Sequence, residues 1–255
     1  IAIAKKAGAG FVLDTPTWRA SADWGAKLGY SEADIVEANR ASVHFMEQIR
    51  SEFQTAKTPI VLNGCIGPRG DGYDPGKIMT VDQAEAYHAA QVQAREQGAA
   101  ELLPALPMPN VNEASGITRA AQKAGLPCAI SFTLETDGKL PTGQALKDAI
   151  QEVDAATGNG PAYYMINCAH PTHFEGVLSD GDWVERVRGL RANASKRSHK
   201  ELDEAPDLDD GNPVELGGQY AELRRKHPQI NVIGGCCGTD HRHVEQISVA
   251  CKLAV

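Results

Sequence analysis

Three cysteines stand at the ends of two short apolar runs that are typical of buried strands. The run 231–235 leads directly into the adjacent pair Cys236 and Cys237. A second run, 163–167, leads into Cys168. Adjacent cysteines rarely bond to each other, because the ring that they would close strains the usual disulfide geometry. Their joint use is better explained by a soft metal ion, and Cys168 supplies a third thiolate if both strand ends meet at one rim of a sheet or barrel.

Three thiolates predict a particular kind of metal chemistry. Zinc held by Cys168, Cys236 and Cys237 keeps one tetrahedral position open, which is the layout of a catalytic rather than a structural site. The complex carries a net charge of −1, so a thiol bound in the fourth position ionises near neutral pH and remains nucleophilic. The natural reaction of that thiolate is attack on a methyl group attached to a positively charged sulfur or nitrogen.

Other interpretations of these residues remain open. The three cysteines are alternatively buried structural thiols, or Cys168 joins His170 and His173 in a mixed site. We expect the two histidines to line or cap the loop instead, because Pro171 directs the chain away. A hydrolase that uses zinc-bound water is a further alternative, but such sites favour histidine and carboxylate ligands.

Composition limits the class of protein. With 255 residues, 42% hydrophobic and 23% charged, the chain is long enough to bury a large core and is typical of a globular protein. A formal net charge of −8 without a basic stripe argues against a nucleic-acid partner. No apolar run is long enough to span a bilayer. A chain of this length needs no disulfides, so we expect a reducing, cytoplasmic setting in which Cys65, Cys128 and Cys251 are ordinary buried thiols.

Apolar strand-like runs alternate with helical patterns along the chain. The expected strands are 10–15, 59–65, 101–106, 128–134, 163–168, 188–192 and 231–235. The expected helices are 1–8, 31–56, 80–97, 111–124, 142–156, 180–187, 214–226 and 240–253. The acidic stretch 195–213 reads as a solvated loop, and His241 and His243 are expected on the surface. This alternation predicts parallel β/α units, and no Gly-x-Gly-x-x-Gly follows the first strand.

A (β/α)8 TIM barrel that lacks its first β/α unit fits the pattern best. The chain does not begin with Met, and its first residues read as the last turn of a helix already under way. We therefore expect residues 1–255 to form a single, N-terminally incomplete barrel domain. In such a barrel the carboxyl ends of the strands converge on one mouth, so the three cysteines lie there together.

Four motifs together resemble those of the homocysteine S-methyltransferase family. They are NCAHP at 167–171, GGCCG at 234–238, GCIGP at 64–68 and DGKLPTG at 137–143. The resemblance covers nearly all of the chain, with 195–213 matching least. It implies a (β/α)8 barrel, zinc held by Cys168, Cys236 and Cys237, and methyl transfer to the thiol of L-homocysteine, giving methionine. It also implies that Thr15 and Trp18 line the amino-acid pocket.

Two further residues belong to the candidate site. Asn167 precedes Cys168 and is expected to orient it or to cap the strand end, and Gly235 precedes the cysteine pair. With Thr15 and Trp18 they form the expected substrate-binding set. The implied partners are a small-molecule thiol acceptor and a methyl donor, while a homo-oligomer is left open by the sequence.

The chain departs from the family pattern in two places. The family's first strand, with its Asp-Gly-Gly or Asp-Gly-Ala, is absent, and Ala105 stands where a glutamate usually contacts the homocysteine amine. Glu101 lies at the wrong end of that strand and Glu113 lies in the next helix. The alternative function is therefore a zinc-binding barrel that is catalytically silent or that uses a different thiol or ligand.

Overall fold

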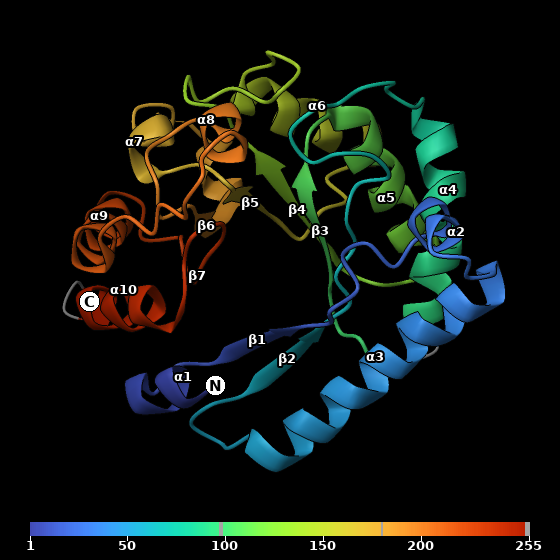
Figure 1. Ribbon diagram of the computed structural model, residues 1–255, viewed down its shortest axis with the longest axis horizontal. Helices are drawn as coiled ribbons and strands as arrows, with labels where there is room; N and C mark the ends of the chain where they lie inside the picture. The colour runs from blue at the N-terminus through green and yellow to red at the C-terminus, as the bar shows by residue number, and fades with distance from the viewer. Residues whose placement is uncertain (97–98, 180, 253–255) are drawn as a thin grey trace. The chain divides into compact units, whose positions relative to one another are not determined.

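The computed structural model describes residues 1–96, 99–179 and 181–252, which form parallel β/α units (Figure 1). Its strands are β1 Phe11–Asp14, β2 Ile60–Asn63, β3 Leu103–Met108, β4 Cys128–Thr133, β5 Tyr163–Asn167, β6 Val187–Ala192 and β7 Val232–Gly235. Strand β1 pairs with β2, and the other five form a sheet in the order β3-β4-β5-β6-β7. The registers of β1–β2, β5–β6 and β6–β7 are all parallel.

Strand neighbours follow the order of the chain. Parallel bridges from Asn63 to Leu102 and from Ile66 to Ala105 connect the end of β2 to β3. Sequential parallel strands joined by helical crossovers are the strand order of a (β/α)8 barrel. The predicted parallel α/β fold is confirmed, and each of the seven expected strands is present within two residues of its expected start.

Several helices begin or end at capping residues that are visible in the sequence. The helices are α1 Ala2–Ala7, α2 Ala22–Lys27, α3 Glu32–Phe53, α4 Val81–Glu96, α5 Val111–Lys123, α6 Leu146–Thr157, α7 Pro171–Phe174, α8 His199–Asp203, α9 Pro213–Lys226 and α10 His241–Lys252. Ser31 caps α3 in a capping box with Asp34. Thr80 and Gln83 exchange the reciprocal bonds of a second capping box at α4. Gly8 ends α1 in the left-handed conformation.

Several short helices differ from the expectations. Helices α2 and α7 were not expected, because each has only six or four residues and no apolar periodicity. The region 180–187 holds a 3-10 turn at Val184–Arg186 instead of an α-helix, and residue 180 lies outside the described residues. Helix α8 interrupts the stretch expected as a loop, because Ser198 and Glu201 form a capping box. Residues 97 and 253 of two expected helices also lie outside the described residues.

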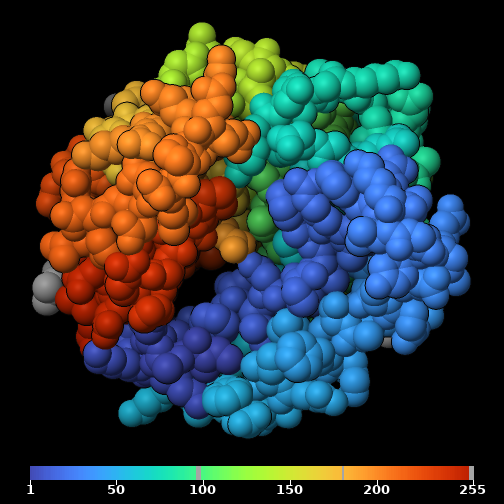
Figure 2. All heavy atoms as spheres, in the orientation of Figure 1, coloured from blue at the N-terminus to red at the C-terminus, as the bar shows by residue number. Residues whose placement is uncertain are grey.

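The chain divides into two compact units. The first comprises Ile1–Ile130 and Glu152–Ala162, and the second comprises Ser131–Gln151 and Tyr163–Val255. In the first unit, Met46 of α3 forms a buried cluster with Ile60 and Leu62 of β2. Helix α3 buries few of its residues, and Figure 2 shows its light-blue atoms exposed on the viewed face.

The second unit is built on β5, β6 and β7. Phe132 and Tyr164 stack with ring centroids 6.0 Å apart, and Leu190 is fully buried opposite Ile166 in the sheet. Helices α9 and α10 lie side by side (Figure 1), and a Cβ on Gly217 would lie only 2.8 Å from the Gln246 carbonyl oxygen. That close approach fixes α10, which follows the cysteine pair. Among the described residues, no helix is both long and apolar enough to cross a bilayer.

Candidate metal centre

The structure brings the three cysteine sulfurs together in the second unit. Cys168 follows β5, while Cys236 and Cys237 follow β7. The Cys168 and Cys236 sulfurs lie 2.6 Å apart, and the Cys236 and Cys237 sulfurs lie 4.0 Å apart. All three lie within 4.8 Å of one another. Cys168 is buried, Cys236 is half-buried and Cys237 is exposed, so the cluster is open on one side.

Backbone bonds at the strand ends place the two cysteine segments. The Cys168 N–H donates to the Arg191 carbonyl oxygen at 3.0 Å, and the Cys236 N–H donates to the Ala192 carbonyl oxygen at 2.8 Å. Both cysteines are thus held by the end of β6, which lies between β5 and β7. Cys168 itself adopts a left-handed backbone conformation with φ 56°. Such a conformation is uncommon for a residue with a side chain and persists where the surroundings fix it.

Asn193 connects the two cysteine segments directly. Its side-chain amide donates to the Cys168 carbonyl oxygen at 3.0 Å, and its side-chain oxygen accepts from the Cys237 N–H at 3.1 Å. The residue itself is 2% exposed, and its bond to the Cys168 carbonyl is buried. Asn193 follows β6 and therefore fixes the distance between the turns on either side of it.

Two glycines let β7 approach the cysteine turn. A Cβ on Gly235 would lie 2.2 Å from the Thr239 hydroxyl oxygen, and that hydroxyl donates to the Cys236 carbonyl oxygen at 2.7 Å. Gly238 has a positive φ of 76°, and a Cβ there would lie 2.9 Å from the Asp209 carbonyl oxygen. The turn around the cysteine pair therefore requires residues without a side chain at both positions.

Asn167 places its amide against the thiols. Its Nδ2 atom lies 3.9 Å from the Cys168 sulfur and 3.7 Å from the Cys236 sulfur. On its other side, Oδ1 accepts a hydrogen bond from the Ser131 hydroxyl. Asn167 thus lies next to two of the three candidate ligands, and Ser131 is a functional candidate that the motifs did not indicate.

Crowding and burial oppose ionisation of the thiols. The neighbouring Cys236 and Cys237 thiols, together with burial, hold the pKa of Cys168 well above its ordinary value. The hydrogen bond with Cys168 lowers the pKa of Cys236, but the Cys237 thiol and burial raise it more, to about 11. Three thiolates at this place therefore need a cation to offset their mutual repulsion.

The donor set fits a soft divalent metal. Sulfurs bound at about 2.3 Å to a tetrahedral zinc ion lie about 3.8 Å apart. The 4.0 Å separation of the Cys236 and Cys237 sulfurs is close to that value. The Cys168 and Cys236 sulfurs are closer, at 2.6 Å, and need to separate by about 1 Å, which is within reach of a side-chain rotation. Thiolate-rich tetrahedral sites favour zinc over hard cations such as Mg²⁺.

The histidines next to the cysteines do not join the cluster. His170 caps α7, with its Nδ1 accepting from the Thr172 N–H at 3.3 Å. The His173 Nε2 lies 2.9 Å from the Lys196 carbonyl oxygen. Burial first, with nearby charged groups, lowers the pKa of His170 to about 4, so its ring is neutral at pH 7. The two side chains cap the loop and do not form a mixed cysteine and histidine site.

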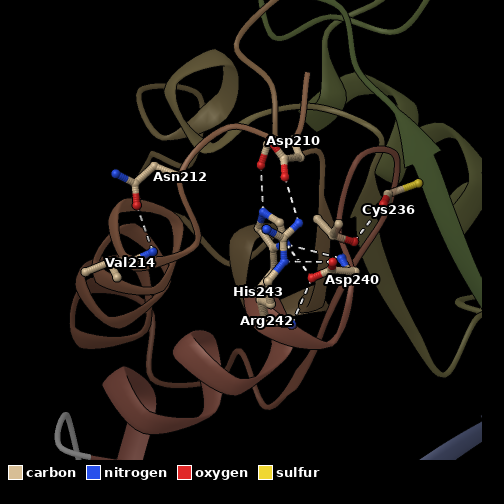
Figure 3. A network of polar contacts seen from close by, with 8 residues as sticks. Asp210, Asn212, Val214, Cys236, Asp240, Arg242 and His243 are labelled. Atoms are coloured by element: carbon tan, nitrogen blue, oxygen red, sulfur yellow. Dashed lines mark hydrogen bonds and ion pairs between the residues drawn. The ribbon is translucent and has the colours of Figure 1, made fainter. Parts of the chain in front are cut away.

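The start of α10 is fixed by a polar network that Figure 3 shows. Arg242 donates to Asp210 at 2.7 Å and to Asp240 at 2.9 Å. His243 contacts the Asp210 carbonyl oxygen at 2.7 Å through Nε2. The expectation that His243 lies on the surface is wrong, because the residue is fully buried. It faces the acidic stretch 195–213 and not solvent. His241 is exposed as expected.

Thr15 and Trp18 belong to the first unit. The Thr15 hydroxyl accepts from the Cys65 N–H at 2.9 Å and lies 2.7 Å from the Thr17 hydroxyl. A Cβ on Gly67 would lie 2.3 Å from the Trp18 carbonyl oxygen. The loops that follow β1 and β2 are therefore locked to each other.

Arg95 was not predicted as a functional residue from the sequence. It holds the loops that follow β1 and β2. Its guanidinium is fully buried and donates to the Thr17 hydroxyl at 2.7 Å, the Cys65 carbonyl oxygen at 2.6 Å and the Asn39 side chain at 2.8 Å. Burial lowers its pKa to about 10, so it remains charged at pH 7. The buried polar residues His88, Gln91 and Arg95 recur at helical spacing in α4, a signal that indicates a polar network beneath that helix.

Comparison with known proteins identifies the family. The model of the homocysteine S-methyltransferase family matches residues 5–251. Crystal structures of the homocysteine methyltransferase MmuM from Escherichia coli share the fold. The oxidized form has a TM-score of 0.76 at 19% identity, and the metallated form has a TM-score of 0.74 at 19% identity. Both alignments cover 97% of this chain and 81% of that chain.

A search of curated proteins found no match. The fold likeness to MmuM and the match to the family model nevertheless agree with each other, and the model spans almost the whole sequence. The chain belongs to the homocysteine S-methyltransferase family and is an S-methyltransferase.

Proposed function

We propose that the protein transfers a methyl group from a sulfonium or ammonium-type donor to the thiol of L-homocysteine, forming methionine. The observation that carries this proposal is the group of three thiols, all within 4.8 Å, at the ends of β5 and β7. Cys168, Cys236 and Cys237 would hold zinc. When bound, the metal supplies a positive charge that keeps the acceptor thiol ionised near neutral pH.

The chain's own residues prepare the site for that chemistry. Asn193 holds the two cysteine turns at a fixed separation. Burial of Cys168 excludes water from one side of the cluster, whereas the exposed Cys237 leaves the other side open to the acceptor. In the proposal, Thr15 and Trp18 contact the amino acid, as the family resemblance implies, and Asn167 and Gly235 complete the substrate-binding set. The thiols have to stay reduced to bind a metal, so a reducing, cytoplasmic setting is part of the proposal. Because the proposed product is methionine, a role in methionine biosynthesis is part of the proposal as well.

A second candidate function rests on the acids of the first unit. Ala105 is fully buried in β3, where the family pattern has a glutamate. Glu101 is engaged by the Leu62 N–H and by Arg50. Glu113 is engaged by the Arg69 N–H at 2.6 Å and by His88 at 2.9 Å. Because these carboxylates are already bound, the alternative is a zinc-binding barrel that takes a thiol without the homocysteine amine, or that is catalytically silent.

Zinc content and turnover of three proteins separate these proposals. The wild type is expected to bind one zinc ion and to form methionine from homocysteine with S-methylmethionine, betaine or a methylated folate. Cys168→Ala is expected to lose both properties. Cys251→Ala is the matched control, because Cys251 is a buried thiol of the same unit outside the cluster.

The outcomes of these measurements decide between the two proposed functions. Full activity of a zinc-free Cys168→Ala protein would contradict a metal site at the cysteines. Zinc bound by the wild type without turnover of any of the three donors favours the alternative function. Loss of zinc from the Cys251→Ala control would show that the cluster is not the specific binding site.

A further inference from the structure

We propose that Ser131 and Asn167 form a positioning relay that controls the electron density on the Cys168 and Cys236 sulfurs. The inference rests on the proposed metal site and goes beyond it, because it assigns a role to two residues that are not metal ligands. Ser131 lies in β4 and Asn167 is the last residue of β5. Both residues are 0% exposed.

The orientation of the Asn167 amide follows from its neighbours. Its nitrogen carries two hydrogens and lies 3.9 Å and 3.7 Å from the Cys168 and Cys236 sulfurs. Metal-bound thiolates only accept hydrogen bonds, so the nitrogen and not the oxygen has to face them. The oxygen points the other way and accepts from the Ser131 hydroxyl. One amide thus serves two sulfurs, and one hydroxyl fixes the amide.

The relay changes the sulfurs electronically as well as geometrically. A donor at the amide oxygen polarises the amide and strengthens donation by its N–H groups. N–H donation withdraws electron density from a thiolate, so the thiolate gives less charge to the metal. A metal held by these sulfurs would then be a stronger Lewis acid toward the acceptor thiol. Because the donors and sulfurs are largely buried, water does not replace a lost bond.

Cobalt(II) substitution tests the relay without relying on turnover. Thiolate-to-cobalt charge-transfer absorption reports how easily electrons leave sulfur. We expect Ser131→Ala to move this absorption to longer wavelength, because weaker N–H donation leaves the sulfurs more electron-rich. The amide also loses the contact that fixes its orientation beside the sulfurs, so metal affinity, measured by chelator competition, is expected to fall by about 10-fold. Ser131→Thr keeps the hydroxyl and is expected to restore both values.

Two further variants keep the test specific. Thr118→Val removes a buried hydroxyl that lies 3.6 Å from the Cys128 sulfur, outside the cluster, and is expected to leave the cobalt spectrum unchanged. Ser131→Cys replaces the hydroxyl with a weak donor of nearly the same shape and covers the case in which Ser131→Ala does not fold. It is expected to shift the absorption in the same direction by a smaller amount.

The results distinguish failure of the relay from failure of the metal site. An unchanged spectrum and unchanged affinity in folded Ser131→Ala, or in Ser131→Cys where alanine prevents folding, overturns the relay. A shift that Ser131→Thr fails to reverse, or that Thr118→Val reproduces, also overturns it. A wild-type protein that binds no cobalt through its thiols overturns the proposed function itself.

Discussion

At the residue scale, the cysteine cluster depends on side chains that hold the backbone in place. Asn193 makes two hydrogen bonds, one to each cysteine segment, and Cys168 keeps a left-handed conformation at φ 56°. Because the backbone conformation is uncommon, the Asn193 bonds and the β6 backbone together determine where the Cys168 sulfur lies. The positions of the candidate metal ligands are therefore set by residues outside the cysteine cluster.

Asn193→Ala tests this role. It removes the hydrogen bonds that Asn193 donates to the Cys168 carbonyl and accepts from the Cys237 N–H, so we expect the free energy of unfolding to fall by about 2 to 4 kcal/mol. Zinc affinity is expected to fall as well, and both are measured by denaturant titration and chelator competition. Asn231→Ala is the control, because Asn231 is exposed. Equal effects of the two substitutions would contradict the role of Asn193.

Neighbouring glycines of β7 allow a matched pair of substitutions. Gly235→Ala places a methyl group 2.2 Å from the Thr239 hydroxyl oxygen, whereas Gly234→Ala meets only Arg191, at 3.9 Å. We expect Gly235→Ala to cost about 1 to 3 kcal/mol and to disturb the cysteine turn, because the added atom overpacks the site. Gly234→Ala is expected to be close to neutral. Thermal unfolding of both proteins provides the comparison, and the reverse order of stability would refute it.

At the element scale, α10 is tied to the acidic stretch before α9. Burial raises the pKa of Asp240, but hydrogen bonds from Arg242 and His243 and the charge of Arg242 lower it more, so the net pKa is below its ordinary value. A carboxyl with a lowered folded pKa stabilises the protein above its unfolded pKa, and this contribution is lost as pH falls toward the folded value. The network therefore weakens in acid.

Asp240→Asn is expected to remove this pH dependence. The variant should be less stable than the wild type at pH 7. The difference should shrink as pH falls below about 4, because the carboxyl of the unfolded wild type becomes protonated there, whereas that of the folded protein takes up its proton only at lower pH. Urea denaturation at several pH values measures the difference. Asp207→Asn is the control, because Asp207 is exposed and lies outside the network. A difference that stays constant from pH 7 to pH 3 would argue against an ionised Asp240 in the network.

The sequence predicted the elements well because their signals are local. Alternating apolar runs and helical periodicity indicated the strands and the long helices, and Thr80 and Gln83 marked the start of α4. The short helices α2, α7 and α8 were missed, because one or two turns carry no periodicity. Helices α7 and α8 begin at capping boxes, whereas α2 has no side-chain cap. His243 was misplaced on the surface, because its burial depends on Asp210, more than 30 residues away in the chain.

The candidate site was predictable in part for the same reason. Two strand ends that carry cysteines are visible in the sequence, and the structure places their sulfurs together. The residues that support them were harder to find. Ser131 has no distinctive spacing, and its role depends on the register of β4 and β5. Arg95 is hidden in an ordinary helix, where only the polar character of its buried face distinguishes it.

At the scale of the whole molecule, metal binding is expected to stabilise the second unit selectively. A ligand that binds only the folded state adds about 4 kcal/mol at a concentration 1,000 times its dissociation constant. The three cysteines all lie in the second unit. Hydrogen exchange should therefore slow in the turns after β5 and β7 on zinc addition, while α4 and α5 in the first unit change little. Uniform protection of both units would contradict a local effect.

X-ray absorption spectroscopy of the zinc-loaded protein tests the central claim most directly. The account predicts three sulfur neighbours at about 2.3 Å from zinc, with a fourth sulfur at a similar distance after homocysteine is added. Cys251→Ala should give the same spectra, because Cys251 lies outside the cluster. Fewer than three sulfur neighbours in the resting protein, or a sulfur count that stays at three with homocysteine bound, would contradict the proposed site and its chemistry.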